Sequence, residues 1–209
     1  MVFNQGNVQD GIAEVIWWIL VNYIEILATL TGLIYLVYSV KGKKLLWVFG
    51  LITSLLYVYV FFRSKIYADM GINVYYVIIS IYGWIHWSRP SDHSRELPVS
   101  KLNPAKGLVL VLISILLFAV IAFILMNFTD SDIALWDAFT TSLSIVATWM
   151  LARKILEHWI VWIIVDSVSA GLYVYKGLYP TVLLFVVYTT LAVFGYYEWR
   201  KLWKIQETT

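Results

Sequence analysis

The amino-acid sequence predicts an all-helical integral membrane protein with seven transmembrane helices. The 209-residue chain is 61% hydrophobic and only 13% charged, whereas soluble domains are about 45–50% apolar and about 25% charged. Charged residues and turn formers divide the chain into seven apolar stretches, each near the length of about 20 residues that crosses a bilayer. These stretches are residues 18–39, 45–63, 70–88, 106–127, 133–151, 158–175 and 181–200.

The distribution of lysine and arginine predicts the orientation in the membrane. When alternate loops are assigned to opposite sides, one side carries twelve Lys and Arg residues and the other carries three. Cytoplasmic loops collect positive charge. We therefore expect an extracytoplasmic N-terminal segment over residues 1–17, a cytoplasmic loop over 90–105 and a cytoplasmic tail over 202–209.

An internal repeat emerges when the chain is aligned with itself at an offset of 112 residues. Eight of the 65 positions from 25 to 89 are then identical, and several charged positions agree in sign. The identical pairs are Thr29 with Thr141, Trp47 with Trp159, Ile52 with Ile164, Tyr67 with Tyr179, Val74 with Val186, Tyr76 with Tyr188, Gly83 with Gly195 and Trp87 with Trp199.

The fourth stretch has no counterpart in this repeat. We therefore predict two three-helix repeats, residues 18–89 and 133–201, joined by a linker helix over residues 106–127. Because the linker is a single span, both repeats run in the same direction through the membrane. Parallel repeats occur in transporters, whose substrate sites lie near the midplane where the halves meet.

Asp166 stands in the middle of the sixth stretch, in the segment WIIVDSVSAGLYVY (162–175). An aspartate at the centre of a membrane helix costs about 2.5–3.5 kcal/mol on insertion scales and usually faces a cavity or a partner. No lysine or arginine lies at a similar depth, so an internal ion pair is not expected. We predict that Asp166 faces the substrate; the alternatives are a protonated, hydrogen-bonded carboxyl group and a proton-coupling residue.

Hydroxyl and aromatic side chains occur at a similar depth in the other repeat helices. Each hydroxyl taken singly is explained by a hydrogen bond to a carbonyl one turn earlier, but together they favour a polar cavity. Aromatic side chains beside a carboxylate suit a flat organic cation, through stacking and cation–π attraction. The candidate binding residues besides Asp166 are Ser54, Asn73, Ser80, Trp84, Thr141, Trp162, Tyr173, Tyr188 and Thr190.

Two further carboxylates, Glu25 and Asp137, occupy equivalent positions near the outer ends of the first and fifth spans. A carboxylate there interacts favourably with the helix dipole, and it would also suit the outer mouth of a cation pathway; both interpretations stay open. Trp87, Trp199 and Trp203 lie near the predicted membrane surfaces and are interpreted as interfacial tryptophans.

The sequence contains none of the motifs on which an enzyme assignment would rest. It has no cysteine, no H-E-x-x-H or G-x-S-x-G motif and no phosphate-binding glycine loop. Its three histidines, His86, His93 and His158, lie at or near the predicted cytoplasmic boundary. We therefore predict no enzyme activity, no bound metal or cofactor and no nucleic-acid partner.

Three segments resemble the PnuC family of bacterial vitamin transporters: IYGWIHWSR (81–89), WDAFTTSLSIVATWMLARKILEHWIVWIIVDSVS (136–169) and G-x-Y (177–179). The resemblance implies a 3+1+3 helix fold similar to that of SWEET sugar transporters, and a homotrimer in the bacterial inner membrane. It also implies uptake by facilitated diffusion, with a cytoplasmic vitamin kinase or pyrophosphokinase that traps the product by phosphorylation.

Members of this family differ in substrate, which is nicotinamide riboside, thiamine or riboflavin. Nicotinamide riboside transporters place asparagines where this chain has Ser80 and Asp166. An amide suits a neutral carboxamide, whereas a carboxylate suits a cation or a protonated ring nitrogen. Thiamine supplies a thiazolium and an aminopyrimidine, so we expect thiamine. Nicotinamide riboside is also cationic and is the alternative.

Overall fold

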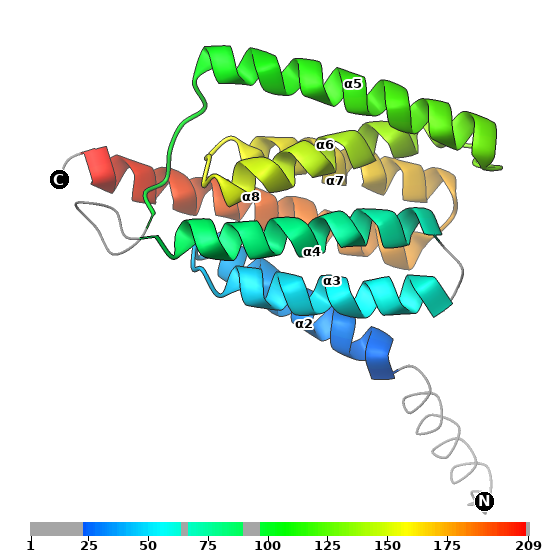
Figure 1. Ribbon diagram of the computed structural model, residues 1–209, viewed down its shortest axis with the longest axis horizontal. Coiled ribbons are helices and arrows are strands. Elements are labelled where there is room, and N and C mark those ends of the chain that lie inside the picture. The colour runs from blue at the N-terminus through cyan, green and yellow to red at the C-terminus, as the bar shows by residue number, and fades with distance from the viewer. Residues whose placement is uncertain (1–22, 64–66, 90–96, 208–209) are drawn as a thin grey trace, which may run out of the picture.

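A computed structural model describes residues 23–63, 67–89 and 97–207, and within these ranges the chain forms seven α-helices and no β-strand. The helices lie roughly alongside one another, and α5 lies along one side of the bundle (Figure 1). They are α2 (Tyr23–Val40), α3 (Leu46–Arg63), α4 (Tyr67–Trp87), α5 (Pro104–Phe128), α6 (Ala134–Ala152), α7 (His158–Tyr175) and α8 (Tyr179–Glu207).

The helices coincide closely with the predicted spans, apart from the end of α8. The sixth span, 158–175, matches α7 in both bounds. The start of the first span, the segment 1–17 and residues 90–96 of the expected loop lie outside the described residues. Residues 202–207 of the expected tail are helical and continue α8. They are tied to the α4–α5 connection, because the Val99 amide donates to Gln206 Oε1 over 2.9 Å and Lys101 lies over the Trp203 ring.

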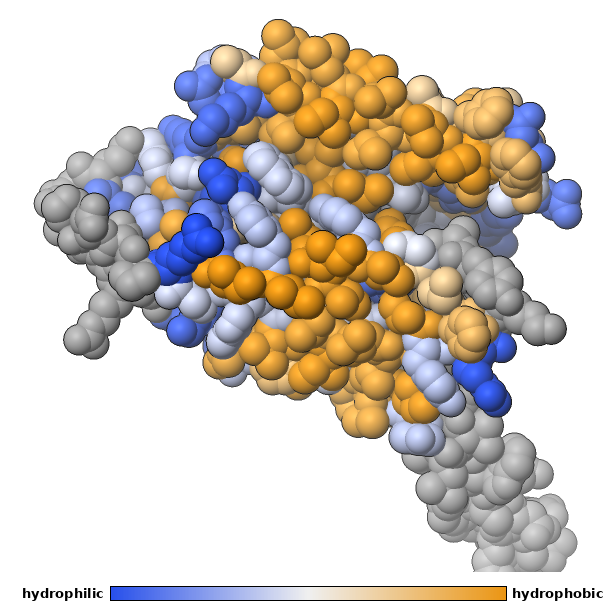
Figure 2. Space-filling view, in the orientation of Figure 1, coloured by the Kyte–Doolittle hydropathy of each residue, from blue (hydrophilic) through white to orange (hydrophobic). Residues whose placement is uncertain are grey.

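The helical surface is apolar enough for a multi-pass membrane protein. Four segments, from α3, α5, α7 and α8, are long and apolar enough to cross a membrane. On α5 the side chains of Leu116 and Phe123 are 65% and 62% exposed. Figure 2 shows hydrophobic side chains gathered over α5 and across α3 and α4, with hydrophilic residues near the helix ends. Such an apolar surface is stable in lipid and unfavourable in water.

The helix boundaries recur at the predicted spacing of 112 residues. Helix α3 covers 46–63 and α7 covers 158–175, while α4 begins at Tyr67 and α8 at Tyr179. The packing recurs as well. In the first set α3 contacts α2 and α4, and in the second set α7 contacts α6 and α8. Between the sets, α2 contacts α8 and α6 contacts α4. We call α2–α4 the first half and α6–α8 the second half.

The same turn ends the first helix of each half. Gly42 and Lys154 occupy equivalent positions and have left-handed backbones, with φ of 62° and 55°. The amide of the next residue donates five residues back in both turns, from Lys43 to Tyr38 over 3.0 Å and from Ile155 to Met150 over 3.0 Å. This bond is the signature of a Schellman cap. A left-handed conformation is unusual for lysine, and Lys154 is held in it by burial and by a 2.6 Å bond to the Leu97 carbonyl.

Four tryptophans fill the core at the end of the bundle where these turns lie. Trp47, Trp87, Trp159 and Trp199, which we call the tryptophan cluster, are at most 4% exposed. The distances between the centroids of neighbouring rings are similar throughout the cluster. Trp47 to Trp87 is 5.6 Å, Trp87 to Trp199 is 5.9 Å, and Trp199 to Trp159 is 5.8 Å. The Trp47–Trp87 and Trp159–Trp199 contacts are edge-to-face, an arrangement that is favourable beyond the area it buries.

The tryptophan cluster also joins the two halves by hydrogen bonds. The Trp87 indole in the first half donates to the Ala152 carbonyl in the second over 3.0 Å. The Trp199 indole in the second half donates to the Ser39 carbonyl in the first, also over 3.0 Å. The prediction that Trp87 and Trp199 are interfacial was therefore wrong. Their rings are buried because both third helices pack against the first helix of the other half.

Candidate functional site

A cavity of about 450 Å³ lies between the two halves. Its walls come from all three helices of the first half and from all three of the second, whereas α5 contributes nothing. The lining residues are Ala28, Thr29, Gly32, Leu33, Tyr35, Leu36, Ser39, Val40, Trp47, Gly50, Thr53, Ser54, Tyr57, Asn73, Tyr76, Ile79, Ser80, Thr148, Leu151, Trp159, Trp162, Asp166, Leu184, Tyr188, Leu191 and Ala192.

Asp166 is the one charged side chain among the described residues that line this cavity. It projects from the middle of α7 and is 6% exposed. Within the described part of the chain, no hydrogen bond or ion pair joins its carboxyl group to another residue. Burial of an uncompensated carboxylate is costly. A bound cation or hydrogen-bond donor would offset this cost.

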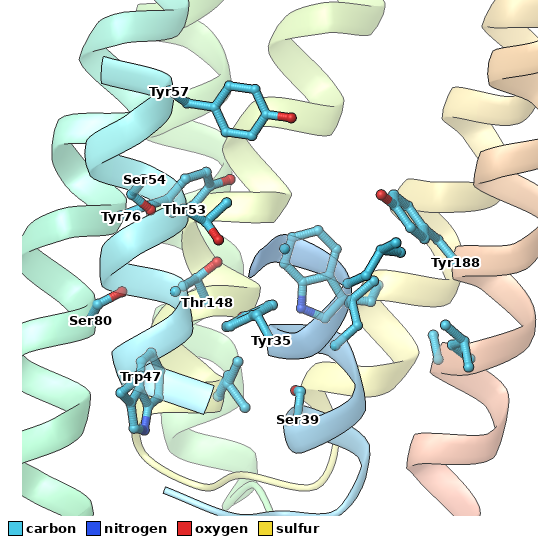
Figure 3. Close-up of a pocket in the computed structure, with 18 of the residues that line it drawn as sticks. Tyr35, Ser39, Trp47, Thr53, Ser54, Tyr57, Tyr76, Ser80, Thr148 and Tyr188 are labelled. Atoms are coloured by element: carbon cyan, nitrogen blue, oxygen red, sulfur yellow. The ribbon is translucent and has the colours of Figure 1, made fainter. Parts of the chain in front are cut away.

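Hydroxyl groups line the wall formed by α3 and α4. Figure 3 shows Thr53, Ser54 and Ser80 on this side of the cavity and Tyr188 of α8 on the opposite side. Thr53 donates to Thr31 over 2.8 Å. The Ser54 and Ser80 side chains are buried, and no hydrogen bond joins them to another described residue. They therefore retain their donors and acceptors for a ligand.

Six of the candidate binding residues from the sequence line the cavity together. The hydroxyls and the amide come from the first half, whereas the carboxylate and two aromatic rings come from the second. The six are Ser54, Asn73, Ser80, Trp162, Asp166 and Tyr188.

The other four candidates do not line the cavity. Trp84 is 36% exposed and carries the Lys44 ammonium 5.3 Å above its ring. Tyr173 stacks on Phe185 with ring centroids 5.1 Å apart. Thr190 is exposed and donates back to the Val186 carbonyl over 2.8 Å, as an isolated hydroxyl in a helix commonly does. Thr141, on α6, is likewise absent from the cavity lining.

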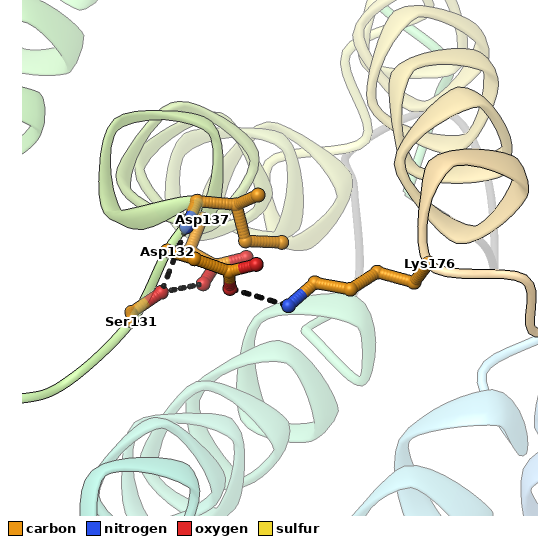
Figure 4. A network of polar contacts seen from close by, with 5 residues as sticks. Ser131, Asp132, Asp137 and Lys176 are labelled. Carbon is orange, nitrogen blue, oxygen red and sulfur yellow. Dashed lines mark hydrogen bonds and ion pairs between the residues drawn. The ribbon is translucent and has the colours of Figure 1, made fainter.

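Asp137 lies at the other end of α6 from the tryptophan cluster, in a local polar network (Figure 4). It accepts a 3.0 Å hydrogen bond from Ser131, and the neighbouring Asp132 is paired with Lys176. The hydrogen bond from Lys176 lowers the pKa of Asp132 and raises the pKa of Lys176. Asp137 does not line the cavity, and the side chain of Glu25 lies outside the described residues. An outer-mouth role for either stays a prediction.

Several residues that line the cavity could not be recognised as binding residues from a single sequence. Tyr35, Tyr57 and Thr148 stand in apolar helices, where an aromatic or hydroxyl side chain is equally common in ordinary packing. One signal does exist in the repeat. When the two halves are aligned, the large residue Trp162 of the second half is equivalent to Gly50 of the first. Such a difference in side-chain size at equivalent positions indicates that the two halves shape the cavity wall differently there.

Comparison with known proteins gives the family. The model of the family described as nicotinamide mononucleotide transporter matches residues 22–201, which is most of the chain. The chain belongs to this family. It is therefore a membrane vitamin transporter of the PnuC family, as the motifs around Trp84 and Trp162 led us to expect.

The relatives that match this chain are named for two different kinds of substrate. The chain is 28% identical over 203 residues to the nicotinamide riboside transporter PnuC of Escherichia coli strain K12, with 85% of each chain covered. It is 23% identical over 179 residues to the riboflavin/roseoflavin transporter RibM of Streptomyces davaonensis, covering 84% of this chain and 83% of that one. These names favour the nicotinamide riboside alternative over the thiamine reading.

A solved structure of the PnuC family supports the fold. A crystal structure of the vitamin B3 transporter PnuC superimposes with a TM-score of 0.70 and 27% sequence identity. The match covers 92% of this chain and 86% of the other.

Proposed function

We propose that this chain carries nicotinamide riboside, a positively charged pyridinium nucleoside, across the membrane through the cavity between its halves. The composition of the cavity supports this most directly, because a buried carboxylate, aromatic rings and hydroxyl groups line one space of about 450 Å³. Small-molecule pockets typically measure about 300–1,000 Å³. The names of relatives such as the Escherichia coli transporter support the same substrate.

The cavity suits a nucleoside better than the nucleotide in the family's description. A phosphate monoester carries about −1.5 to −2 charges near neutral pH, and proteins usually bind it with arginine, lysine or helix N-termini. Among the described lining residues there is no Lys, Arg or His, and the charged one is Asp166. A phosphate would therefore lie in the same cavity as a carboxylate and gain no compensating cation.

Thiamine is the second candidate, and Asp166 is the observation that favours it. A carboxylate pairs well with a thiazolium or with an aminopyrimidine. Thiamine has a single hydroxyl, however, whereas a ribose carries several that would match the hydroxyl wall of Thr53, Ser54 and Ser80. The hydroxyl wall and the relatives together favour the nucleoside.

The arrangement we propose for transport is two parallel three-helix repeats around linker helix α5, the 3+1+3 organisation of SWEET-like transporters. The halves would rock around the cavity and expose it alternately to the two sides. The cavity ends at the tryptophan cluster, because Trp47 and Trp159 belong to both. Separation of the halves at this end would break the indole bonds to Ala152 and Ser39.

Removal of either of these bonds is expected to favour the state that is open at the tryptophan cluster. Trp87→Phe and Trp199→Phe each delete one inter-half hydrogen bond of about 1 kcal/mol, which corresponds to about a fivefold change in a conformational equilibrium. The chain has no cysteine, so Ser39→Cys in the cavity wall can serve as a single thiol probe. The rate of maleimide labelling at this probe should rise several-fold in both variants.

Trp84→Phe is the matched control for this labelling experiment, because Trp84 lies on the same helix as Trp87 but is exposed. Among the described residues, no hydrogen bond joins its indole to the second half. This variant should leave the labelling rate unchanged. Equal rates in the parent protein, Trp87→Phe and Trp199→Phe would contradict a role of these bonds in closing the cavity.

We further propose facilitated diffusion with no coupling ion, in a homotrimer of the bacterial inner membrane with an outside N-terminus and a cytoplasmic C-terminus. The side with twelve Lys and Arg residues supports this orientation. A cytoplasmic kinase or pyrophosphokinase would trap the vitamin by phosphorylation. The alternative, in which Asp166 couples uptake to protons, predicts accumulation driven by a pH gradient.

Binding and uptake measurements test this proposal. Purified protein is titrated with nicotinamide riboside, nicotinamide mononucleotide and thiamine, with intrinsic tryptophan fluorescence as the readout. We expect nicotinamide riboside to bind most tightly and the mononucleotide to bind at least about tenfold more weakly, since a phosphate gains no cation. Uptake into liposomes should reach equilibrium without accumulation. Preference for the mononucleotide, or accumulation driven by a proton gradient, would contradict the respective part of the proposal.

A further inference from the structure

The cavity walls differ between the halves at two pairs of equivalent positions. Gly50 of α3 corresponds to Trp162 of α7, and Tyr35 of α2 corresponds to Ala147 of α6. The first half therefore carries its large aromatic residue on its first helix and a glycine on its second. In the second half the first helix carries the small residue, an alanine, and the second helix carries the large aromatic residue. Tyr35, Gly50 and Trp162 all line the cavity.

Tyr35 packs directly on the backbone of Gly50. A Cβ atom built on Gly50 would lie 3.1 Å from Tyr35 Cδ2, 3.2 Å from Tyr35 Cε2 and 3.2 Å from Ser80 Oγ. These distances are shorter than ordinary carbon contacts of about 3.5–4.0 Å. Gly50 is not among the residues with a positive φ, so a glycine is needed here for space and not for backbone conformation. The absence of a side chain lets the Tyr35 ring lie deep against α3.

The position of this ring limits the room in the cavity. Figure 3 shows Tyr35 projecting from α2 between the hydroxyl wall of Thr53 and Ser80 and the opposite helix with Tyr188. Trp162 supplies a second aromatic side chain from α7, one turn before Asp166. A ligand ring placed near Asp166 would therefore share the cavity with an aromatic group from each half.

We propose that Tyr35, seated on Gly50, sets the size of the aromatic ring system that the cavity accepts, admitting a single cationic ring and excluding a fused tricyclic one. This inference rests on the proposed function of the cavity. It identifies Tyr35 as a specificity-determining residue. A relative at 23% identity is named for riboflavin and roseoflavin, so the names of proteins similar to this chain include substrates of different ring size.

Affinities for a small and a large flat ligand test the inference. Nicotinamide riboside and riboflavin are titrated calorimetrically into the parent protein, Tyr35→Ala and Tyr35→Phe. Loss of the ring in Tyr35→Ala should weaken nicotinamide riboside and strengthen riboflavin, shifting the ratio of the two affinities at least about tenfold. Tyr35→Phe keeps the ring and removes only the hydroxyl, so its ratio should stay within about twofold of the parent.

Gly50→Ala tests the same idea with the tyrosine in place. Its methyl group must push the Tyr35 ring towards the cavity, so the affinity for nicotinamide riboside should fall by about threefold or more while the protein still folds. An unchanged affinity ratio in Tyr35→Ala, or a parallel loss of both ligands, would reduce Tyr35 to a packing residue and overturn the inference. A parent protein that does not bind nicotinamide riboside would instead overturn the proposed function, and this inference with it.

Discussion

Asp166→Ala is expected to abolish tight binding of the cationic vitamin without loss of the fold. Asp166 is buried in the cavity wall, and no described residue pairs with its carboxyl group. Removal of one member of a buried, hydrogen-bonded charge pair typically costs about 2–5 kcal/mol of binding. Even the lower value corresponds to about a 30-fold increase in Kd. Calorimetric titration with nicotinamide riboside measures this loss directly.

The stability of the same variant separates a binding role from a structural one. In the absence of ligand, the carboxylate of Asp166 bears a desolvation cost that no partner in the described chain offsets. Its replacement by alanine should therefore leave the apparent melting temperature unchanged or raise it slightly. Ser167→Ala is a suitable control, because Ser167 is the next residue on α7 but is exposed and does not line the cavity. A marked fall in melting temperature for Asp166→Ala alone would indicate that the carboxylate stabilises the fold.

Asp166→Asn distinguishes the two candidate substrates. An asparagine keeps hydrogen-bonding capacity and removes the charge, and an amide can pair with the carboxamide of nicotinamide riboside. The charge-assisted bond to thiamine would be lost. We therefore expect thiamine binding to weaken more than nicotinamide riboside binding. Equal, small effects on both ligands would be inconsistent with contact between Asp166 and either one.

The depth of a residue in the membrane could be predicted from the sequence, but the direction in which its side chain points could not. Hydropathy and charge place Asp166, Ser54 and Ser80 near the middle of their helices, and these three do line one cavity. The same reasoning placed Thr190 at that depth, yet its side chain is exposed and bonded to its own helix. In a membrane helix apolar residues face lipid and protein alike, so periodicity does not reveal the buried face.

The core at the helix ends was hidden for a related reason. Tryptophan is favoured at membrane interfaces, so Trp87 and Trp199 gave no sign of burial, and only the packing of α4 on α6 and of α8 on α2 encloses them. The repeat could be recognised because equivalent contacts require equivalent residues. Gly83 with Trp47 and Gly195 with Trp159 are identical pairs in the two halves, and each pair forms one contact.

Gly83→Ala and Gly195→Ala are expected to destabilise the protein to a similar extent, because each glycine provides the surface on which a buried tryptophan lies. A Cβ atom on Gly83 would overlap the six-membered ring of Trp47, and one on Gly195 would lie 2.5 Å from Trp159 Cζ2. The rings have little freedom to move, since both are at most 4% exposed. Overpacking of a core commonly costs about 1–3 kcal/mol, which for a domain of this size is roughly 2–4 °C in Tm per kcal/mol.

Gly171→Ala is the control that separates this contact from the general effect of a methyl group in a helix. Gly171 lies within α7, has no positive φ, and a Cβ atom there would meet no heavy atom within 4 Å. Alanine is favoured over glycine inside helices by about 1 kcal/mol, so Gly171→Ala should melt at the same temperature as the parent or above it.

Within the described residues, no hydrogen bond holds the indole nitrogens of Trp47 and Trp159. Packing alone therefore holds both rings, against the glycines and against the neighbouring rings of Trp87 and Trp199. Displacement of the two rings should also weaken ligand binding, because both line the cavity. Equal melting temperatures for all three variants would show that the rings shift freely and that the two glycine contacts do not stabilise the fold.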